Sequence, residues 1–180
     1  MGYFSNNLVN APEYMTFETL PISPEYEQQV SLAKQLSSDP FSFRCMFFHL
    51  PADQRLHLKY ALINQLTNND HVVLSVNIAD FIEELLEALR QGAGCSYARY
   101  YVDSDILLVD DLQLMANKEA TQETFYAHIL KPRIEAGLPT VMLSECSHEE
   151  LSGSLRKDLH NLLRLGLHTP SETEYDPNRR

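Results

Sequence analysis

Short apolar runs alternate with longer amphipathic segments along most of this chain. Continuous apolar stretches are typical of buried strands, and they occupy residues 45–48, 72–76, 106–109 and 140–143. Apolar residues at helical spacing predict four long helices, at residues 54–65, 78–90, 120–135 and 149–163. Because strands alternate with helices, we expect a parallel sheet that is covered by helices on both faces.

The ends of the chain are less periodic. Ser23 followed by Pro24 is typical of a helix start, and we expect that helix to run to about Gln35. Residues 166–168 are a candidate fifth strand. We therefore expect an N-terminal arm at 1–14, one α/β domain at 15–168, and a flexible C-terminal tail at 169–180.

Length, charge and cysteine usage narrow the class of protein. The 180 residues fit one domain with a full core, and 14 basic against 25 acidic side chains give a formal net charge of −11. An acidic chain without a basic stripe is a poor stand-alone nucleic-acid binder. No apolar run is long enough for a membrane helix, and the first residues do not form a signal peptide, so we expect a cytoplasmic protein.

The residue types that usually bind metals show no metal-binding spacing. Three cysteines lie far apart, which favours reduced thiols over disulfides or a zinc site. Seven histidines form no HExxH motif, so solvated or packed side chains are the expectation. We therefore expect no bound metal.

The strongest chemical signal is an apolar segment that ends in two acids, Asp110 and Asp111. This is the Walker B pattern of P-loop ATPases, in which one acid holds magnesium through water and the other orients the attacking water. Two alternatives remain. One is a solvated acidic turn after a buried strand, and the other is a weak magnesium site that needs no nucleotide.

The residues that follow carry a resemblance to a known family. Asp110-Asp111-Leu112-Gln113 continue into Asn117-Lys118-Glu119 and then into 121–125, TQETF. This stretch resembles the DnaA/Hda-type AAA+ replication initiator family, which has IDDIQ, NKE and TQEEFF there. Weaker likeness extends the match to roughly residues 15–168. It implies a P-loop NTPase-like AAA+ core, a three-layer sandwich with a five-stranded parallel sheet.

The family's nucleotide-binding loop is degenerate in this chain. Aligned without a gap, its GGVGLGKT falls on residues 49–56, beginning at His49. A P-loop needs glycine N–H groups and a Lys for phosphates, and a hydroxyl for magnesium. Here Pro51 lacks an N–H, Asp53 adds negative charge, Arg55 replaces the Lys and Leu56 has no hydroxyl. We expect no bound nucleotide or other cofactor and no ATPase activity; an ATPase with an unorthodox loop is the alternative.

Other positions that match the family's functional residues are also altered. Glu145 stands where the sensor I residue is Asp or Asn, and Leu162 stands at the arginine-finger position. Arg156 or Arg164 replaces that finger only after a register shift. Ala120 and Glu87 occupy positions that are basic in the family. The helical lid and the C-terminal helix-turn-helix are expected to be missing, and we expect DNA binding to be weak.

Together these features predict a non-catalytic module that acts by protein–protein interaction and modulates the initiation of DNA replication. The expected partner is DnaA or another AAA+ or helicase-loading protein, with a homo-oligomer as an alternative. The predicted interface is the former nucleotide face, formed by Leu50, Pro51, Asp53, Arg55, Glu145, Arg156 and Arg164. The alternative is that this region is an inert plug and partners bind elsewhere.

Overall fold

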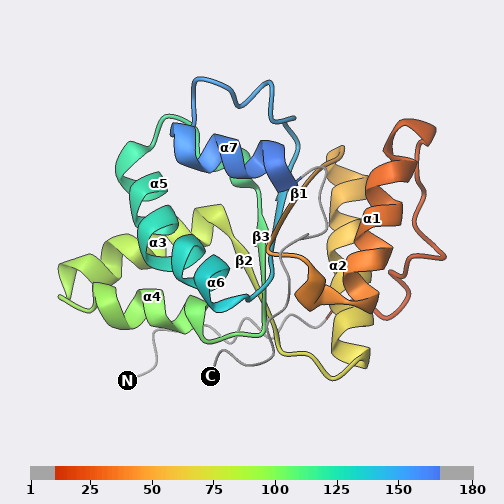
Figure 1. Ribbon diagram of the computed structural model, residues 1–180, viewed down its shortest axis with the longest axis horizontal. Coiled ribbons are helices and arrows are strands. Elements are labelled where there is room, and N and C mark those ends of the chain that lie inside the picture. The colour runs from red at the N-terminus through yellow and green to blue at the C-terminus, as the bar shows by residue number, and fades with distance from the viewer. Residues whose placement is uncertain (1–10, 167–180) are drawn as a thin grey trace.

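Four short apolar segments form one parallel sheet at the centre of the protein. In the computed structural model, which describes residues 11–166 (and only the backbone of 94–96, 165 and 166), the strand order is β1-β4-β3-β2 (Figure 1). The strands are β1 (Cys45–His49), β2 (Val73–Asn77), β3 (Ile106–Asp110) and β4 (Thr140–Ser144). Every residue of β3 and β4 is buried, as their continuous apolar sequences predict for inner strands.

Helices cover both faces of this sheet, so the predicted three-layer sandwich is confirmed (Figure 1). One face carries α1 (Glu27–Ser38) and α2 (Ala52–Asn68). The other carries α3 (Ile78–Arg90), α4 (Gly94–Val102), α5 (Glu119–Phe125), α6 (Lys131–Ala136) and α7 (Lys157–Gly166). Each face has its own core, because successive strand residues point to opposite sides. Leu107 and Val109 pack on the α3 side, and Ile106 and Leu108 on the α2 side.

The third predicted long helix is one continuous helical segment of three parts. A π-helical turn, Tyr126–Leu130, joins α5 to α6. Gly137 ends the segment in the left-handed conformation, with φ at 75°, which a residue without a Cβ adopts at little cost. Arg133 of α6 is fully buried.

Several sequence predictions are corrected. Within residues 11–166 the sheet has four strands and not five: residue 166 ends α7, and 167–168 lie outside the described residues. The helix expected at 149–163 begins only at Lys157, because turns with Gly153 at φ 84° occupy the preceding segment. Helix α4 was not predicted.

The remaining boundaries agree closely with expectation. The helix expected from Ser23 starts as a 3-10 turn, Pro24–Tyr26, and continues as α1 to Ser38. Residues 1–10 of the predicted arm and all of the predicted tail at 169–180 lie outside the described residues. In the described part of the chain, no helix is long and apolar enough to cross a membrane.

Candidate functional site

Asp110 and Asp111 lie where the carboxyl end of β3 meets the following turn. As predicted, β3 is an inner strand, paired with β2 on one side and β4 on the other. Asp110 is the last residue of β3 and is 3% exposed. Asp111 is half-buried and has a left-handed backbone, with φ at 58°. Two carboxyl groups are therefore held side by side at the edge where ligands of parallel α/β proteins bind.

A buried arginine from α2 is bonded to both of these acids. The Arg55 guanidinium donates through Nη1 to Oδ1 of Asp110 and, at 2.6 Å, to Oδ1 of Asp111. Its Nη2 donates to Oε1 of Glu145 at 3.0 Å. One helical turn further along α2, Lys59 Nζ donates to the other oxygen of Asp110 at 2.9 Å. We call these five residues the Arg55 cluster: Arg55, Lys59, Asp110, Asp111 and Glu145.

Two neutral amide side chains near the sheet edge hold Asp111 of the Arg55 cluster in place. The Asn77 amide, at the end of β2, donates to Oδ2 of Asp111 at 2.5 Å, and the Gln113 amide donates to its Oδ1 at 2.9 Å. The Gln113 carbonyl oxygen accepts from the Ser144 hydroxyl of β4 at 3.0 Å. Partial burial by itself raises the pKa of Asp111, but the bonds from Asn77 and Arg55 outweigh burial and lower it. This carboxylate is therefore held in its ionised form.

The connection between β1 and α2 is only two residues long. Leu50 is fully buried, and its N–H donates to the Ser144 carbonyl at 3.1 Å. Pro51 precedes the first helical residue, Ala52, and its carbonyl accepts from the Arg55 N–H at 2.8 Å. Residues 52–56 are thus already helical. The segment has no glycine and no open loop to wrap a phosphate chain.

The residues present do not fit a magnesium nucleotide. Arg55 already forms ion pairs with the two acids that would hold magnesium and orient the attacking water, and Leu56 supplies no hydroxyl ligand. Among residues 11–166, no group of three or more His, Cys, Asp or Glu side chains is arranged to hold a metal ion. The cluster has instead the composition of an internal ion-pair network.

Three of the other predicted residues lie outside the Arg55 cluster. The His49 N–H donates to Gln29 Oε1 at 2.8 Å, and burial lowers the pKa of the His49 ring. Arg156 pairs with Asp158 at 3.1 Å and Glu123 at 3.3 Å. Arg164 is exposed in the last turn of α7. Among the described residues, none of these three side chains forms an ion pair with Asp110 or Asp111.

The predicted partner interface needs correction at two of its residues. Leu50 is 0% exposed and Arg55 is 6% exposed, so neither is available on the surface. The cause is that Leu50 fills the core beneath α2, and three carboxylates draw the Arg55 side chain inward. Pro51, Asp53 and Leu56 remain exposed, and the Glu145 side chain is 47% exposed.

Sequence reasoning missed three residues that complete the site: Lys59, Asn77 and Gln113. A signal was present for the first, because Lys59 lies four residues after Arg55 and so shares its helix face. Asn77 directly follows the apolar run at 72–76, at the sheet edge where the Asp pair was expected. The signal for Gln113 was its place at the end of the Asp110-Asp111-Leu112-Gln113 stretch that resembles the family's IDDIQ.

The fold and the acids after β3 define the class: this is an AAA+ core of the P-loop NTPase type. A family model described as the bacterial DnaA ATPase domain matches residues 12–170. The chain therefore belongs to the bacterial DnaA ATPase domain family, as its sequence resemblance indicated.

Solved structures of DnaA and of a helicase loader share this fold. Domain III of the Thermotoga maritima replication initiation protein DnaA aligns with a TM-score of 0.81 and 21% identity, over 88% of this chain and 67% of that one. Replication initiator DnaA bound to AMPPCP and single-stranded DNA aligns with a TM-score of 0.80 and 20% identity, over 88% of this chain and 50% of that one. The DnaC helicase loader aligns with a TM-score of 0.69 and 14% identity, over 87% of this chain and 95% of that one. The chain thus spans half the length of that nucleotide-bound DnaA.

Proposed function

We propose that this chain is a non-catalytic DnaA-like module that modulates the initiation of DNA replication by binding a protein partner. The observation that carries the proposal is the position of Arg55. Its guanidinium, a positive charge that is part of the chain, forms ion pairs with Asp110 and Asp111. In an active relative, one of these acids would hold magnesium and the other would orient the attacking water.

Energetics favour this internal cation over a bound one. Magnesium can reach the two acids only if Arg55 withdraws from a site where its side chain is 8% exposed. Removing one partner from a buried ion pair typically costs about 3–5 kcal/mol. That handicap lowers the apparent affinity of a competing cation by a factor of at least about 100. With no glycine loop to supply compensating contacts, nucleotide binding lacks a driving force.

The scaffold nevertheless keeps every layer of the fold. Each face of the sheet has its own hydrophobic core, and the fold aligns with domain III of Thermotoga maritima DnaA at a TM-score of 0.81. A fold that is maintained without its phosphate-binding groups supports a role in which shape and surface matter. The partner we propose is the replication initiator or another AAA+ or helicase-loading protein, since the similar structures include DnaA and the DnaC helicase loader.

A nucleotide titration tests the non-catalytic part of the proposal. Calorimetry with ATP and ADP at millimolar magnesium is expected to show no binding, while the DnaA whose structure holds AMPPCP serves as the positive control. Micromolar affinity of this chain for either nucleotide, or magnesium-dependent ATP hydrolysis, would overturn it and support the alternative of an unorthodox ATPase.

Capture by purified DnaA and helicase-loading proteins tests the partner. The informative variants lie on the exposed remainder of the former nucleotide face, Asp53→Lys and Leu56→Glu, because a change at buried Arg55 also disturbs folding. Val72→Glu is a matched control, since Val72 is 60% exposed and precedes β2 at the opposite end of the sheet. If the first two variants bind as the control does, the interface is elsewhere. If none of the purified proteins binds, the interaction proposal fails.

Weak DNA binding follows from the same proposal. The net charge is −11, and Ala120 and Glu87 replace residues that are basic in the family. Glu87 accepts hydrogen bonds from Arg90 and Gln91, so it also neutralises the nearest basic side chain. Submicromolar binding to single-stranded or duplex DNA at about 150 mM salt would contradict the expectation.

A further inference from the structure

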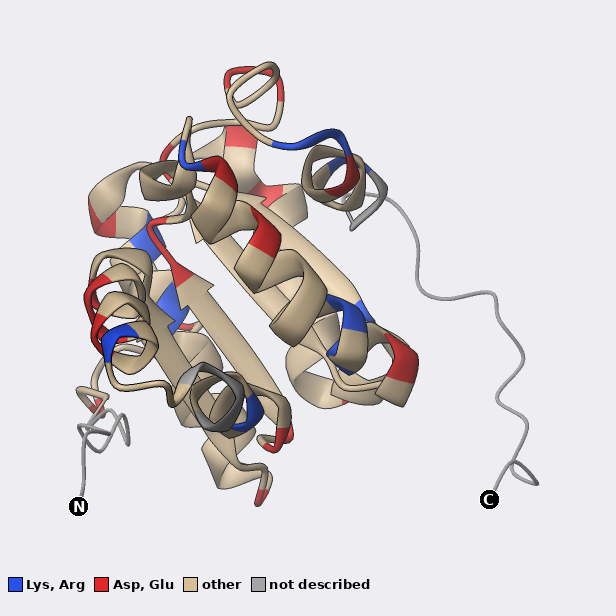
Figure 2. Cartoon of the chain, turned by 90° about the vertical axis from the view of Figure 1, so that its left-hand side faces the viewer, with Lys and Arg blue, Asp and Glu red and all other residues tan. Residues whose placement is uncertain are grey.

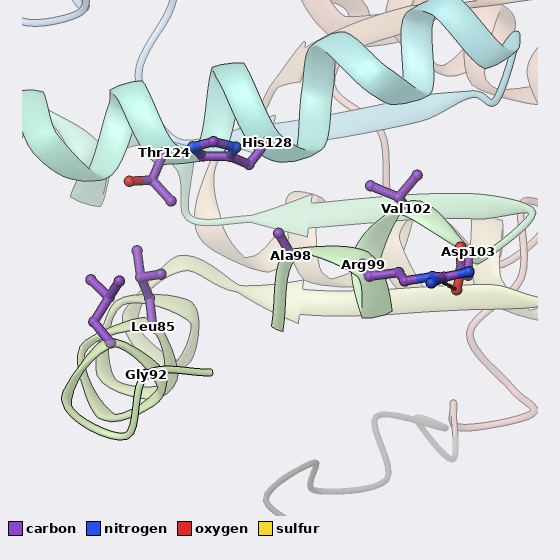
Figure 3. A pocket seen from close by; sticks show the side chains of 9 residues that line it. Leu85, Gly92, Ala98, Arg99, Val102, Asp103, Thr124 and His128 are labelled. Atoms are coloured by element: carbon purple, nitrogen blue, oxygen red, sulfur yellow. Dashed lines mark ion pairs between the residues drawn. The ribbon is translucent and has the colours of Figure 1, made fainter. Parts of the chain in front are cut away.

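A largely apolar groove lies on the opposite side of the sheet from α2, between α3, α4 and the helical segment 119–136 (Figure 3). Its cavity is about 620 Å³, within the range of binding pockets. Leu85 and Leu89 of α3, Ala98 and Val102 of α4, and Thr124 and His128 line it. We call it the α3–α4 groove. It shares no residue with the Arg55 cluster.

An exposed apolar stripe extends the groove along α3. Leu86 is 50% exposed and Leu89 is 56% exposed, and half-buried Ile82 precedes Leu86 by one turn. Residues 82, 86 and 89 follow the spacing i, i+4, i+7 that one helix offers to another. A stripe of this kind beside an apolar cavity is the geometry that holds an amphipathic helix.

Acidic side chains border this stripe. Asp80, Glu83 and Glu87 lie three and four residues apart on α3, so they form a row next to Leu86. The one basic residue of α3, Arg90, pairs with Glu87 at 3.4 Å. At the far end of the groove, Arg99 is paired with Asp103 at 3.5 Å (Figure 3). Figure 2 shows this face of the molecule, with acidic segments on its helices.

The wall opposite α3 has an uncommon backbone. His128 belongs to the π-helical turn, and Thr124 belongs to the preceding helix, α5. In Figure 3 both side chains project from this wall into the groove, toward Ala98 and Leu85. Short π-helical turns occur frequently at functional sites. Thr124 and His128 are four residues apart, about one helical turn, and both line this wall of the groove.

We propose that the α3–α4 groove binds an amphipathic helix of another protein, whose apolar side chains enter the cavity and whose Lys or Arg residues face Asp80, Glu83 and Glu87. The charge distribution selects this occupant. A second copy of the chain would bring an identical acidic row against the first, and a nucleic acid would bring phosphates. This surface is additional to the one in the proposed function, and its occupancy does not depend on nucleotide.

Fluorescence anisotropy with three labelled synthetic peptides of 18 residues tests the groove. The first places Leu at helical i, i+3, i+4 spacing and Lys elsewhere, the second has the same composition in scrambled order, and the third has Glu for Lys. The first is expected to bind the full chain at least tenfold more tightly than either of the others. Equal binding of the scrambled peptide, or no binding of the first, would overturn the proposal.

Two surface variants locate the binding. Leu89→Glu removes an apolar contact and adds an acid, and the added acid by itself would strengthen binding of the cationic peptide. We therefore expect affinity for the first peptide to fall at least tenfold, and that fall is due to the lost apolar contact. Val72→Glu adds the same charge at an exposed apolar position outside the groove, and it is expected to leave affinity unchanged. Equal effects of the two variants contradict the proposal. So does sedimentation that shows a dimer lost in Leu89→Glu, because it would assign the groove to a second copy.

Failure here and failure of the proposed function are distinguishable. A nucleotide titration that reveals ATP binding overturns the non-catalytic role but leaves the peptide result intact. A negative peptide result with no nucleotide binding removes the groove and leaves the proposed function in place.

Discussion

Two buried arginines clamp opposite ends of the same pair of strands. Arg55 bonds to Asp110 and Asp111 at the carboxyl end of β3, and to Glu145 just after β4. Arg133 lies at the amino ends, where its guanidinium bonds to the carbonyl oxygens of Asp105 and Pro139, the residues before β3 and β4. Further acceptors of Arg133 are the carbonyls of Tyr101, Val102 and Ser104 and the hydroxyls of Ser104 and Thr140.

The two arginines differ in the groups that accept their hydrogen bonds. Arg133 is surrounded mainly by neutral carbonyls, and its burial lowers the pKa to about 10, although the charge of Asp105 raises it somewhat. Arg55 faces three carboxylates, two of which match the family's magnesium and water positions. A purely structural clamp can be built from backbone acceptors. The Arg55 contacts are made instead with acids at the carboxyl ends of strands, where ligands of parallel α/β proteins bind, which fits the proposed non-catalytic role.

The largest effect is expected from Arg133→Met. The change leaves several buried carbonyl oxygens without donors, each costing about 1–3 kcal/mol, so we expect more than about 4 kcal/mol of lost stability. Urea unfolding followed by circular dichroism measures it. If the variant does not fold, Arg133→Lys retains the charge without the planar fork and is expected to be intermediate. A loss below about 1 kcal/mol for Arg133→Met would contradict the assigned role.

Arg55→Met is expected to cost about 3–5 kcal/mol, because Asp110 is left buried with Lys59 as its remaining cation. Millimolar magnesium is expected to restore part of the loss, about 1.4 kcal/mol at ten times its dissociation constant. It should restore nothing in Arg133→Met. Thermal unfolding with and without magnesium distinguishes the two clamps, and equal responses would remove the distinction between them.

Lys59→Met tests the second cation of the cluster. Lys59 donates one bond to Asp110, and its side chain is 14% exposed, so we expect a loss of about 1–2 kcal/mol. Stability measured by urea unfolding at neutral pH checks this value. A cost equal to that of Arg55→Met would mean that Arg55 is not the principal partner of the acids.

The smallest effect is a difference in pH dependence between Asp111→Asn and the unchanged protein. The folded pKa of Asp111 lies below its ordinary value of 3.8. Its stabilising contribution is therefore complete above that value and is lost as the pH falls through the folded pKa. The gap in unfolding free energy between the two proteins should shrink below about pH 4. A gap that is constant from pH 7 to pH 3 would contradict the lowered pKa.

The sequence predicted the strands well because both faces of the sheet are buried in hydrophobic cores, so most strand positions are apolar and form continuous runs. It predicted α3 at 78–90, which is its observed extent. It missed α4, whose segment begins near Gly92 and Gly94 and has no clear apolar period. That helix depends on tertiary packing instead, with Tyr97 and Tyr101 buried against α3 and Arg133 bonded to its last carbonyls.

The site was predictable in its residue types and not in its geometry. The motif comparison identified Arg55, Asp110, Asp111 and Glu145 as altered or retained positions, and the structure brings all four together. The prediction that Arg55 lies on the surface was wrong. Its burial depends on carboxylates 55 to 90 residues away in the sequence, which a local pattern does not contain.

If the chain has lost a nucleotide loop, as the proposed function holds, the two-residue connection between β1 and α2 makes that loss hard to reverse in evolution. Residues 52–56, which align with the second half of the family's loop, now form the first turns of α2. A single glycine reintroduced there would weaken the helix by about 1 kcal/mol before it restored any phosphate contact. Replacing Arg55 by Lys or Leu56 by Thr would leave each side chain on a helix instead of a loop. On the proposed function, a phosphate-binding loop could therefore be rebuilt in this chain only by several changes made together.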